Sequence, residues 1–148
     1  MSKVTVQIDI DAPKEAVFEA MLDPSRLSEW VTIHRKVNHA DPGTLQEGYK
    51  MDQTLALRGA PFRVKWTLTQ YGPSTEATWE GKGPGGSYAR TAYQLSDASG
   101  GGTHFEYLNE YKAPGGFLGA AASRALVGGT SASEARKSLE RLKELLED

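Results

Sequence analysis

The sequence predicts an α+β fold, in which a seven-stranded antiparallel sheet curves around a long C-terminal helix and two short helices join the first two strands. Three patterns predict this order. An alternating apolar and polar segment opens the chain, turn-forming clusters divide its middle into short segments of the same kind, and a helical stretch closes it.

Residues 3–11 form the first predicted strand, because apolar and polar side chains alternate along them. Pro13 then ends the strand and suits the first turn of a helix. Apolar side chains follow at helical spacing, at Ala16, Val17, Ala20 and Met21. Residues 23–24 (DP) repeat the signal and predict a second short helix that reaches Trp30.

Six further strands are predicted between residues 32 and 112, because five clusters of turn residues interrupt the alternation. The clusters are residues 41–43 (DPG), 58–61 (RGAP), 71–74 (YGPS), 81–86 (GKGPGG) and 96–102 (SDASGGG). Short strands joined by tight turns pair in sequence as an antiparallel meander. In residues 62–69 the apolar side chains share one face and the polar ones the other, so one face is covered and the other meets water.

The chain after residue 116 is predicted to be helical to its end, over about 30 residues or ~45 Å. Its last part carries a packing face made of Leu139, Leu142, Leu145 and Leu146. Residues 119–132 are instead nearly all small, which fits either a close approach of helix and sheet or a helix that roofs a cavity. Residues 128–129 (GG), followed by a capping-box pattern in residues 131–134 (SASE), predict a kink.

The composition is that of one globular domain, predicted to span residues 1–148. The net charge is -2 and no basic run could neutralise phosphates, so nucleic acid is not expected as a partner. The absence of cysteine excludes disulfides, thiolate metal sites and cysteine nucleophiles. Since the chain opens on a strand and has no stretch of about 18 apolar residues, we expect a cytoplasmic protein without a membrane span.

Four short motifs along the chain resemble, in the same order, segments of a known protein superfamily. Residues 10–18 (IDAPKEAVF) and 23–30 (DPSRLSEW) resemble the opening of proteins of the START-like (SRPBCC) superfamily. Residues 101–103 (GGT) are similar to the segment before the last strand of these proteins, and residues 113–119 (APGGFLG) to the start of their final helix. The resemblance spans essentially the whole chain and implies the helix-grip fold, which encloses apolar molecules.

Two further segments, residues 30–34 (WVTIH) and 61–67 (PFRVKWT), resemble an actinobacterial branch described as polyketide cyclase/dehydrase-like. Some mycobacterial members of this branch are described as toxins of toxin–antitoxin pairs. The superfamily also includes lipid-transfer, quinone-binding and hormone-binding proteins. The resemblance therefore implies binding of an apolar molecule and carries no residue-level site for a reaction.

Catalytic and cofactor motifs are weak in this sequence. Residues 81–86 match G-x-G-x-x-G, but a strand follows where a nucleotide site needs a helix, so they are interpreted as a hairpin loop. His34, His39 and His104 lack metal-ligand spacing, and no G-x-S-x-G segment is present. We therefore expect no metal, no cofactor and no serine hydrolase chemistry.

The residues predicted to face the covered side of the sheet are mainly aromatic and include two amides: Tyr49, Met51, Gln53, Leu55, Trp66, Trp79, Tyr107, Asn109 and Tyr111. Rings alone could fill a core. An unpartnered buried amide costs ~1 to 3 kcal/mol, however, so Gln53 and Asn109 favour a pocket in which a polar ligand group or water contacts them. The candidate ligand-binding residues are Tyr49, Gln53, Trp66, Trp79, Tyr107 and Asn109, with His34 at the mouth.

Three functions remain open. The first is binding of a small hydrophobic ligand (a lipid, a quinone or a polyketide-like compound) between the sheet and the C-terminal helix. The second is a polyketide cyclase/dehydrase-type enzyme, for which His34, Tyr49 and Tyr107 are the candidate acids or bases. The third is a toxin or protein-interaction role that uses an exposed surface. The sequence is also compatible with a homodimer.

Overall fold

The computed structural model describes residues 2–57, 60–112 and 129–147. Within them the predicted order of elements is confirmed. The elements are β1 (Ser2–Ile10), α1 (Lys14–Leu22), the 3-10 turn η1 (Pro24–Arg26), α2 (Leu27–Trp30), β2 (His34–Ala40), β3 (Lys50–Leu57), β4 (Ala60–Gly72), β5 (Glu76–Lys82), the 3-10 turn η2 (Pro84–Gly86), β6 (Tyr88–Asp97), β7 (Thr103–Lys112) and α4 (Gly129–Leu146).

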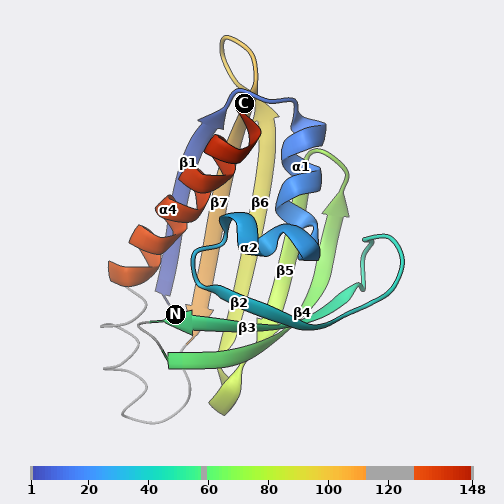
Figure 1. Ribbon diagram of the computed structural model, residues 1–148, viewed down its shortest axis with the longest axis vertical. Helices are drawn as coiled ribbons and strands as arrows, with labels where there is room; N and C mark the ends of the chain where they lie inside the picture. Colours follow the sequence, from blue (N-terminus) through green and yellow to red (C-terminus); the bar gives the residue numbers. More distant parts are fainter. Residues whose placement is uncertain (1, 58–59, 113–128, 148) are drawn as a thin grey trace.

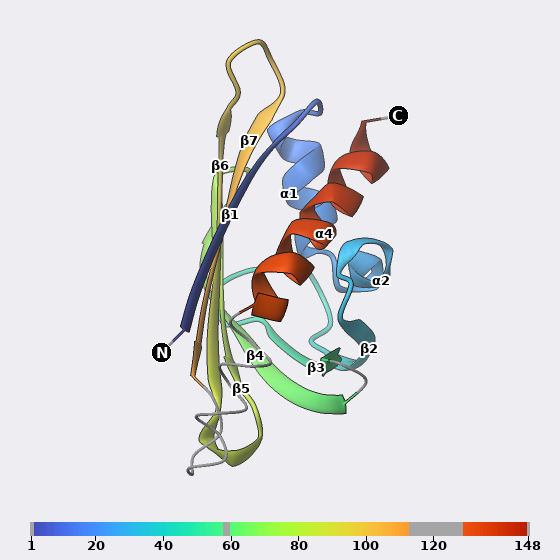
Figure 2. The same ribbon diagram turned by 90° about the vertical axis from the view of Figure 1, so that its left-hand side faces the viewer.

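The seven strands form one antiparallel sheet in the order β1-β7-β6-β5-β4-β3-β2 (Figure 1). Each strand from β2 to β6 pairs with the next in sequence, and β1 completes the sheet by pairing with β7. Figure 2 shows that the sheet bends and that α1, α2 and α4 all lie on its inner face. The predicted α+β helix-grip arrangement is therefore confirmed.

The described part of α4 packs through the predicted leucine face. Leu139 and Leu142 are 1% and 0% exposed, and they meet apolar side chains of the sheet and of α1. At its end, α4 is tied to the last residues of β1 and to the residue that follows the strand. Lys143 Nζ donates to the Asp9 carbonyl at 2.9 Å, and the Glu147 carboxylate accepts from the Asp11 backbone N–H at 2.9 Å. The helix thus closes the apolar interior along β1.

Some local predictions are settled and others lie outside the described residues. As predicted, a hairpin loop with a 3-10 turn in place of a helix joins β5 and β6, but it spans residues 83–87, because Gly81 and Lys82 still belong to β5. The capping-box interpretation of residues 131–134 is wrong, because Gly129 and Thr130 already belong to α4. The predicted helix start, the small residues up to 128 and the kink there lie outside the described residues. No helix in the described part of the chain is long and apolar enough to cross a membrane.

Candidate functional site

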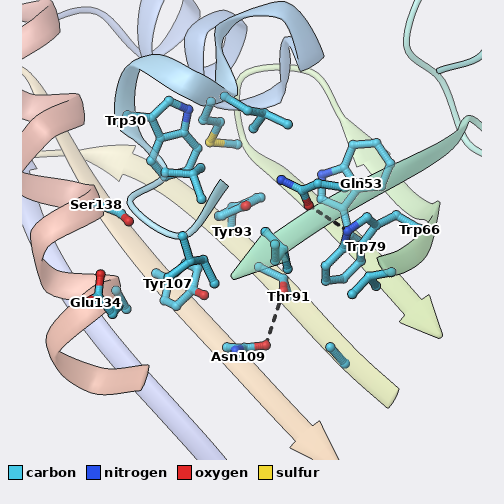
Figure 3. A pocket seen from close by; sticks show the side chains of 18 of the residues that line it. Trp30, Gln53, Trp66, Trp79, Thr91, Tyr93, Tyr107, Asn109, Glu134 and Ser138 are labelled. Carbon is cyan, nitrogen blue, oxygen red and sulfur yellow. Dashed lines mark hydrogen bonds between the residues drawn. The ribbon is translucent and has the colours of Figure 1, made fainter. Parts of the chain in front are cut away.

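A pocket of about 150 Å³, here called the inner pocket, lies between the inner face of the sheet, α2 and α4 (Figure 3). Its walls are mainly apolar and aromatic. Alternation along β3 to β7 brings side chains distant in sequence to one place, because every second residue of each strand faces inward. Five of the sequence-predicted residues line it: Gln53, Trp66, Trp79, Tyr107 and Asn109.

Tyr49 and His34 are not among the lining residues. Tyr49 precedes β3 and lies beyond Trp79, whose ring it meets edge-on at a centroid distance of 6.3 Å. It lines a separate groove beneath α1. His34 begins β2 and reaches the pocket only through its hydrogen bond to Gln53.

Two consecutive hydrogen bonds connect Trp66, Gln53 and His34 at the side of the pocket formed by β2, β3 and β4. Trp66 Nε1 donates to Gln53 Oε1 at 2.9 Å, and Gln53 Nε2 contacts His34 Nδ1 at 2.8 Å. An indole N–H can only donate, so the amide must present its oxygen to Trp66 and its NH₂ group to His34. His34 Nδ1 is therefore the acceptor, and the neutral ring carries its proton on Nε2. The expectation that Gln53 needs a ligand or water is thus wrong, because protein groups satisfy its amide.

Protonation of His34 is expected to destabilise the fold. Burial lowers the pKa of His34, and a proton on Nδ1 would face the NH₂ group of Gln53. Since the folded pKa lies below that of the unfolded chain, the unfolded state binds more protons as the pH falls through about 6.5. The difference in unfolding free energy between the wild-type protein and His34→Gln should shrink from pH 7.5 to pH 5, as measured by urea titration.

His104 provides a control of opposite sign. Its ring contacts the Asp9 carboxylate at 2.6 Å, and this hydrogen bond raises the pKa of His104. The stability that it contributes is present below about pH 6.5 and is lost as the pH rises through the raised pKa. The advantage of the wild-type protein over His104→Gln should therefore grow as the pH falls. If the difference from the wild-type protein changed with pH in the same direction for both variants, at least one of the two assignments would be wrong.

Gly81 makes room for the Trp66 ring. It lies opposite Trp66 in the pairing of β4 with β5, and a Cβ atom at residue 81 would lie 2.6 Å from Trp66 Cε3 and 2.6 Å from Val64 Cγ1. Real Cβ contacts are not this short. The absence of a side chain at residue 81 thus allows the indole to lie across β5 and reach Gln53.

Hydrogen-bond donors from β6 and β7 form the opposite wall. Asn109 Oδ1 accepts from the Thr91 hydroxyl at 3.2 Å, which leaves its NH₂ group without a hydrogen-bond partner among the described residues. Tyr93 and Tyr107 stand beside it, with ring centroids 5.9 Å apart (Figure 3). Burial raises the pKa of Tyr107 to about 12 and also raises the pKa of Tyr93, so both hydroxyls keep their protons at neutral pH.

The sequence interpretation missed the polar groups that α4 brings to the pocket. Glu134 and Ser138 both line it. The Thr32 hydroxyl donates to the Glu134 carboxylate, and the Thr32 backbone N–H donates to Ser138 Oγ at 3.0 Å. Glu134, Ser138 and the buried Leu142 follow one another at i, i+4 spacing, a signal that could have placed both polar residues on the inward face. Thr91 and Tyr93 also line the pocket, and the alternation along β6 is the signal that could have placed them on its inward face.

An antiparallel sheet bent around a terminal helix, with a small apolar pocket between them, defines a helix-grip protein of the START-like class. The chain belongs to the family "Polyketide cyclase / dehydrase and lipid transport", which it matches over residues 1–147. The similarity to this family confirms the SRPBCC resemblance seen in the motifs.

Two relatives from Mycobacterium tuberculosis (strain ATCC 25618 / H37Rv) are similar in sequence. One is called Toxin Rv0910 and is 34% identical over 86 residues, which is 58% of this chain and 60% of that protein. The chain therefore matches less than two thirds of the toxin's length. The other, the protein Rv1546, is 28% identical over 98% of this chain and 99% of its own length.

Solved structures share the fold at low sequence identity. Protein CV1439 from Chromobacterium violaceum has a TM-score of 0.73 and 18% identity, with 100% of this chain and 99% of that chain covered. The Aha1 dimer from Colwellia psychrerythraea has a TM-score of 0.67 and 17% identity, with 99% and 97% covered. At these identities the similarity establishes the fold alone.

Proposed function

We propose that the chain binds a small hydrophobic molecule in the inner pocket, such as a lipid, a quinone or a polyketide-like compound. The observation that carries this proposal is the combination of aromatic walls with hydrogen-bond donors that no other described residue uses. Family membership supports it, since the family description includes lipid transport. The ligand-binding residues of this proposal are Gln53, Trp66, Trp79, Tyr107 and Asn109, with His34 behind Gln53 and Tyr49 behind Trp79.

The unused groups indicate the polarity of the ligand. Trp66 and Gln53 donate to other protein groups, whereas the Asn109 NH₂ group and the hydroxyls of Tyr93 and Tyr107 donate to no other described residue. An amide NH₂ group can only donate. A ligand oxygen that accepts hydrogen bonds, such as a carbonyl, is therefore the group that this wall suits best.

The size of the pocket indicates how much of the ligand it holds. A cavity of about 150 Å³ accommodates one aromatic ring, whereas complete drug-sized sites occupy about 300 to 1,000 Å³. The inner pocket is therefore expected to hold a single ring or a short chain with its polar group.

A matched pair of ligands tests this function. Acetophenone and ethylbenzene have similar shapes, but only acetophenone carries a carbonyl oxygen. We expect saturable changes in indole emission and in ligand-detected NMR with acetophenone, since Trp30, Trp66 and Trp79 line the pocket. Replacement of Asn109 by leucine should weaken acetophenone binding roughly tenfold through loss of one hydrogen bond, and should leave ethylbenzene binding unchanged.

Tyr88→Phe serves as the control variant, because the Tyr88 hydroxyl donates a hydrogen bond to the Glu80 carboxylate on the outer face of the sheet, away from the inner pocket. It should bind both ligands like the wild-type protein. Absence of saturable binding by acetophenone, ethylbenzene, fatty acids and quinones would refute the proposal. If Asn109→Leu lost affinity equally for both ligands, the hydrogen-bond donors of β6 and β7 would not select a carbonyl.

An enzymatic function of the polyketide cyclase/dehydrase type is the second candidate. Among the residues that line the inner pocket, Glu134 is the carboxylate that could act as an acid or a base. Of the earlier candidates, His34 has its Nδ1 engaged by Gln53, and Tyr49 lies outside the pocket. Consumption of a polyketide-like compound, with loss of turnover in Glu134→Gln, would favour this function over simple binding.

A toxin role is favoured by one observation, the 34% identity to the relative that is named a toxin. Growth arrest on induced expression of the chain would support it. A cytoplasmic location and a homodimer also stay predictions. Cell fractionation and static light scattering of the purified protein would check them.

A further inference from the structure

We propose a second binding site, a groove beneath α1 that takes the alkylammonium group of a small organic cation. This site, here called the α1 groove, is separate from the inner pocket and has a volume of about 610 Å³. It is bounded by α1 and η1, by residues 43–45 and by the turn between β4 and β5, which lies beside α1 in Figure 1. A groove bounded on several sides by these elements suits a compact group such as an alkylammonium.

The floor of the groove is aromatic. The rings of Phe18 and Tyr71 lie 5.6 Å apart at an interplanar angle of 50°, and Tyr49 also lines the floor. Aromatic rings that line a recess offer π faces and edges to a group bound there. Cations within about 6 Å of such faces are attracted by the ring quadrupole.

The rim of the groove is acidic. Glu15, Glu19 and Asp23 follow one another at i, i+4 spacing along α1 and its C-cap, and all three line the groove. No lysine or arginine is found among the described residues that line it, and neither glutamate forms an ion pair within that part of the chain. Like charges at i, i+4 destabilise a helix, so a bound cation would relieve an existing repulsion.

The helix itself adds to the negative potential. Glu19 and Asp23 stand at the C-terminal end of α1, where the aligned peptide dipoles already place partial negative charge, and the last turn has no basic residue. Asp23 Oδ1 accepts hydrogen bonds from the Ser25 backbone N–H at 2.9 Å and the Ser25 hydroxyl at 2.7 Å. Its Oδ2 accepts no hydrogen bond from the described residues.

Tyr49 gives an independent indication of a ligand. The residue is 7% exposed and lines the groove, and its hydroxyl has no hydrogen-bond partner among the described residues. Burial and then the charges of Asp41 and Asp23 raise the pKa of this hydroxyl. The same field that disfavours a phenolate favours a cation, and the hydroxyl oxygen can accept a hydrogen bond from an ammonium group.

A titration with choline and its neutral carbon analogue, 3,3-dimethyl-1-butanol, tests the site. We expect choline at low ionic strength to shift the aromatic NMR signals of Phe18, Tyr49 and Tyr71 saturably, and the neutral alcohol to leave them unchanged. The double variant Glu15→Gln/Glu19→Gln should weaken choline binding roughly fivefold, since each exposed charge contributes little. It should also fold normally, because a repulsion is removed.

The matched control is Glu140→Gln/Glu144→Gln, which makes the same change of charge at i, i+4 spacing on the exposed side of α4. It should bind choline like the wild-type protein. Equal weakening in both double variants would show a general charge effect and would overturn the site, as would equal shifts with the neutral alcohol or none with choline. Shifts with a lysine peptide but not with choline would overturn the small-molecule assignment in favour of a basic peptide.

Discussion

Removal of residues 131–148 is expected to abolish cooperative unfolding. The deletion takes away Leu139 and Leu142, which are essentially fully buried, and each contributes ~1.5 to 3 kcal/mol by burial. It also exposes the apolar inner face of the sheet and removes the contacts of Thr32 with α4. Because whole domains are stable by only about 5 to 15 kcal/mol, the remaining chain should be molten, with a broad urea transition and strong binding of a hydrophobic dye.

A chain that ends at Leu146 is the control for this deletion. It loses the contact of Glu147 with the Asp11 backbone N–H and its ion pair with Lys143, both near the surface. The expected loss of stability is small, because both contacts are exposed to solvent, and the cooperative transition should be retained. If the chain without residues 131–148 unfolded as sharply as this control, α4 would not be closing the core.

Replacement of Gly81 by alanine is expected to cost about 1 to 3 kcal/mol of unfolding free energy. The added methyl group would overlap the Trp66 ring and the Val64 side chain, so the indole must leave its place across β5. That movement would break the bond from Trp66 to Gln53 and release the Gln53 amide. Urea unfolding measures the first effect, and a changed Trp66 indole N–H signal in NMR reports the second.

Gly72→Ala is the matched control within the same sheet. A Cβ at residue 72 would meet Thr75 Oγ1 at 3.0 Å and Glu76 Cγ at 3.1 Å, which are side-chain atoms at a turn and can move away. Its cost should stay below that of Gly81→Ala, and the Trp66 signal should be unchanged. A Gly81→Ala protein with the stability of Gly72→Ala would contradict the close contact between residue 81 and the indole.

The strands could be predicted because their signals are local. Alternation and turn residues fix which side chains of a strand share a face, and this placed Trp66, Trp79 and Tyr107 on one wall. The leucine face of α4 was predictable for the same reason, since its 3.6-residue period is visible in the sequence.

The partners of the polar groups were not predictable in this way. Contact of Gln53 with His34 depends on how β2 pairs with β3, and that pairing shifts register between His34 and Lys36. A bulge of this kind leaves no clear mark in the alternation. Tyr49 continues the alternation of β3 in the sequence, but the strand begins at Lys50, and Tyr49 contacts the Trp79 ring and lines the groove beneath α1 in place of the pocket.

The pairing of β1 with β7 also governs when the protein can fold during its synthesis. Val6 pairs with Tyr107, so β1, the strand synthesised first, cannot pair until β7, the last strand, has been synthesised. The ribosome releases the N-terminus first, and strands β2 to β6 can pair with their neighbours as they emerge. The apolar side chains of β1 stay without a partner throughout that period. We therefore expect a nascent chain to carry an incomplete sheet, open to chaperones, until residues 103–147 have left the ribosome.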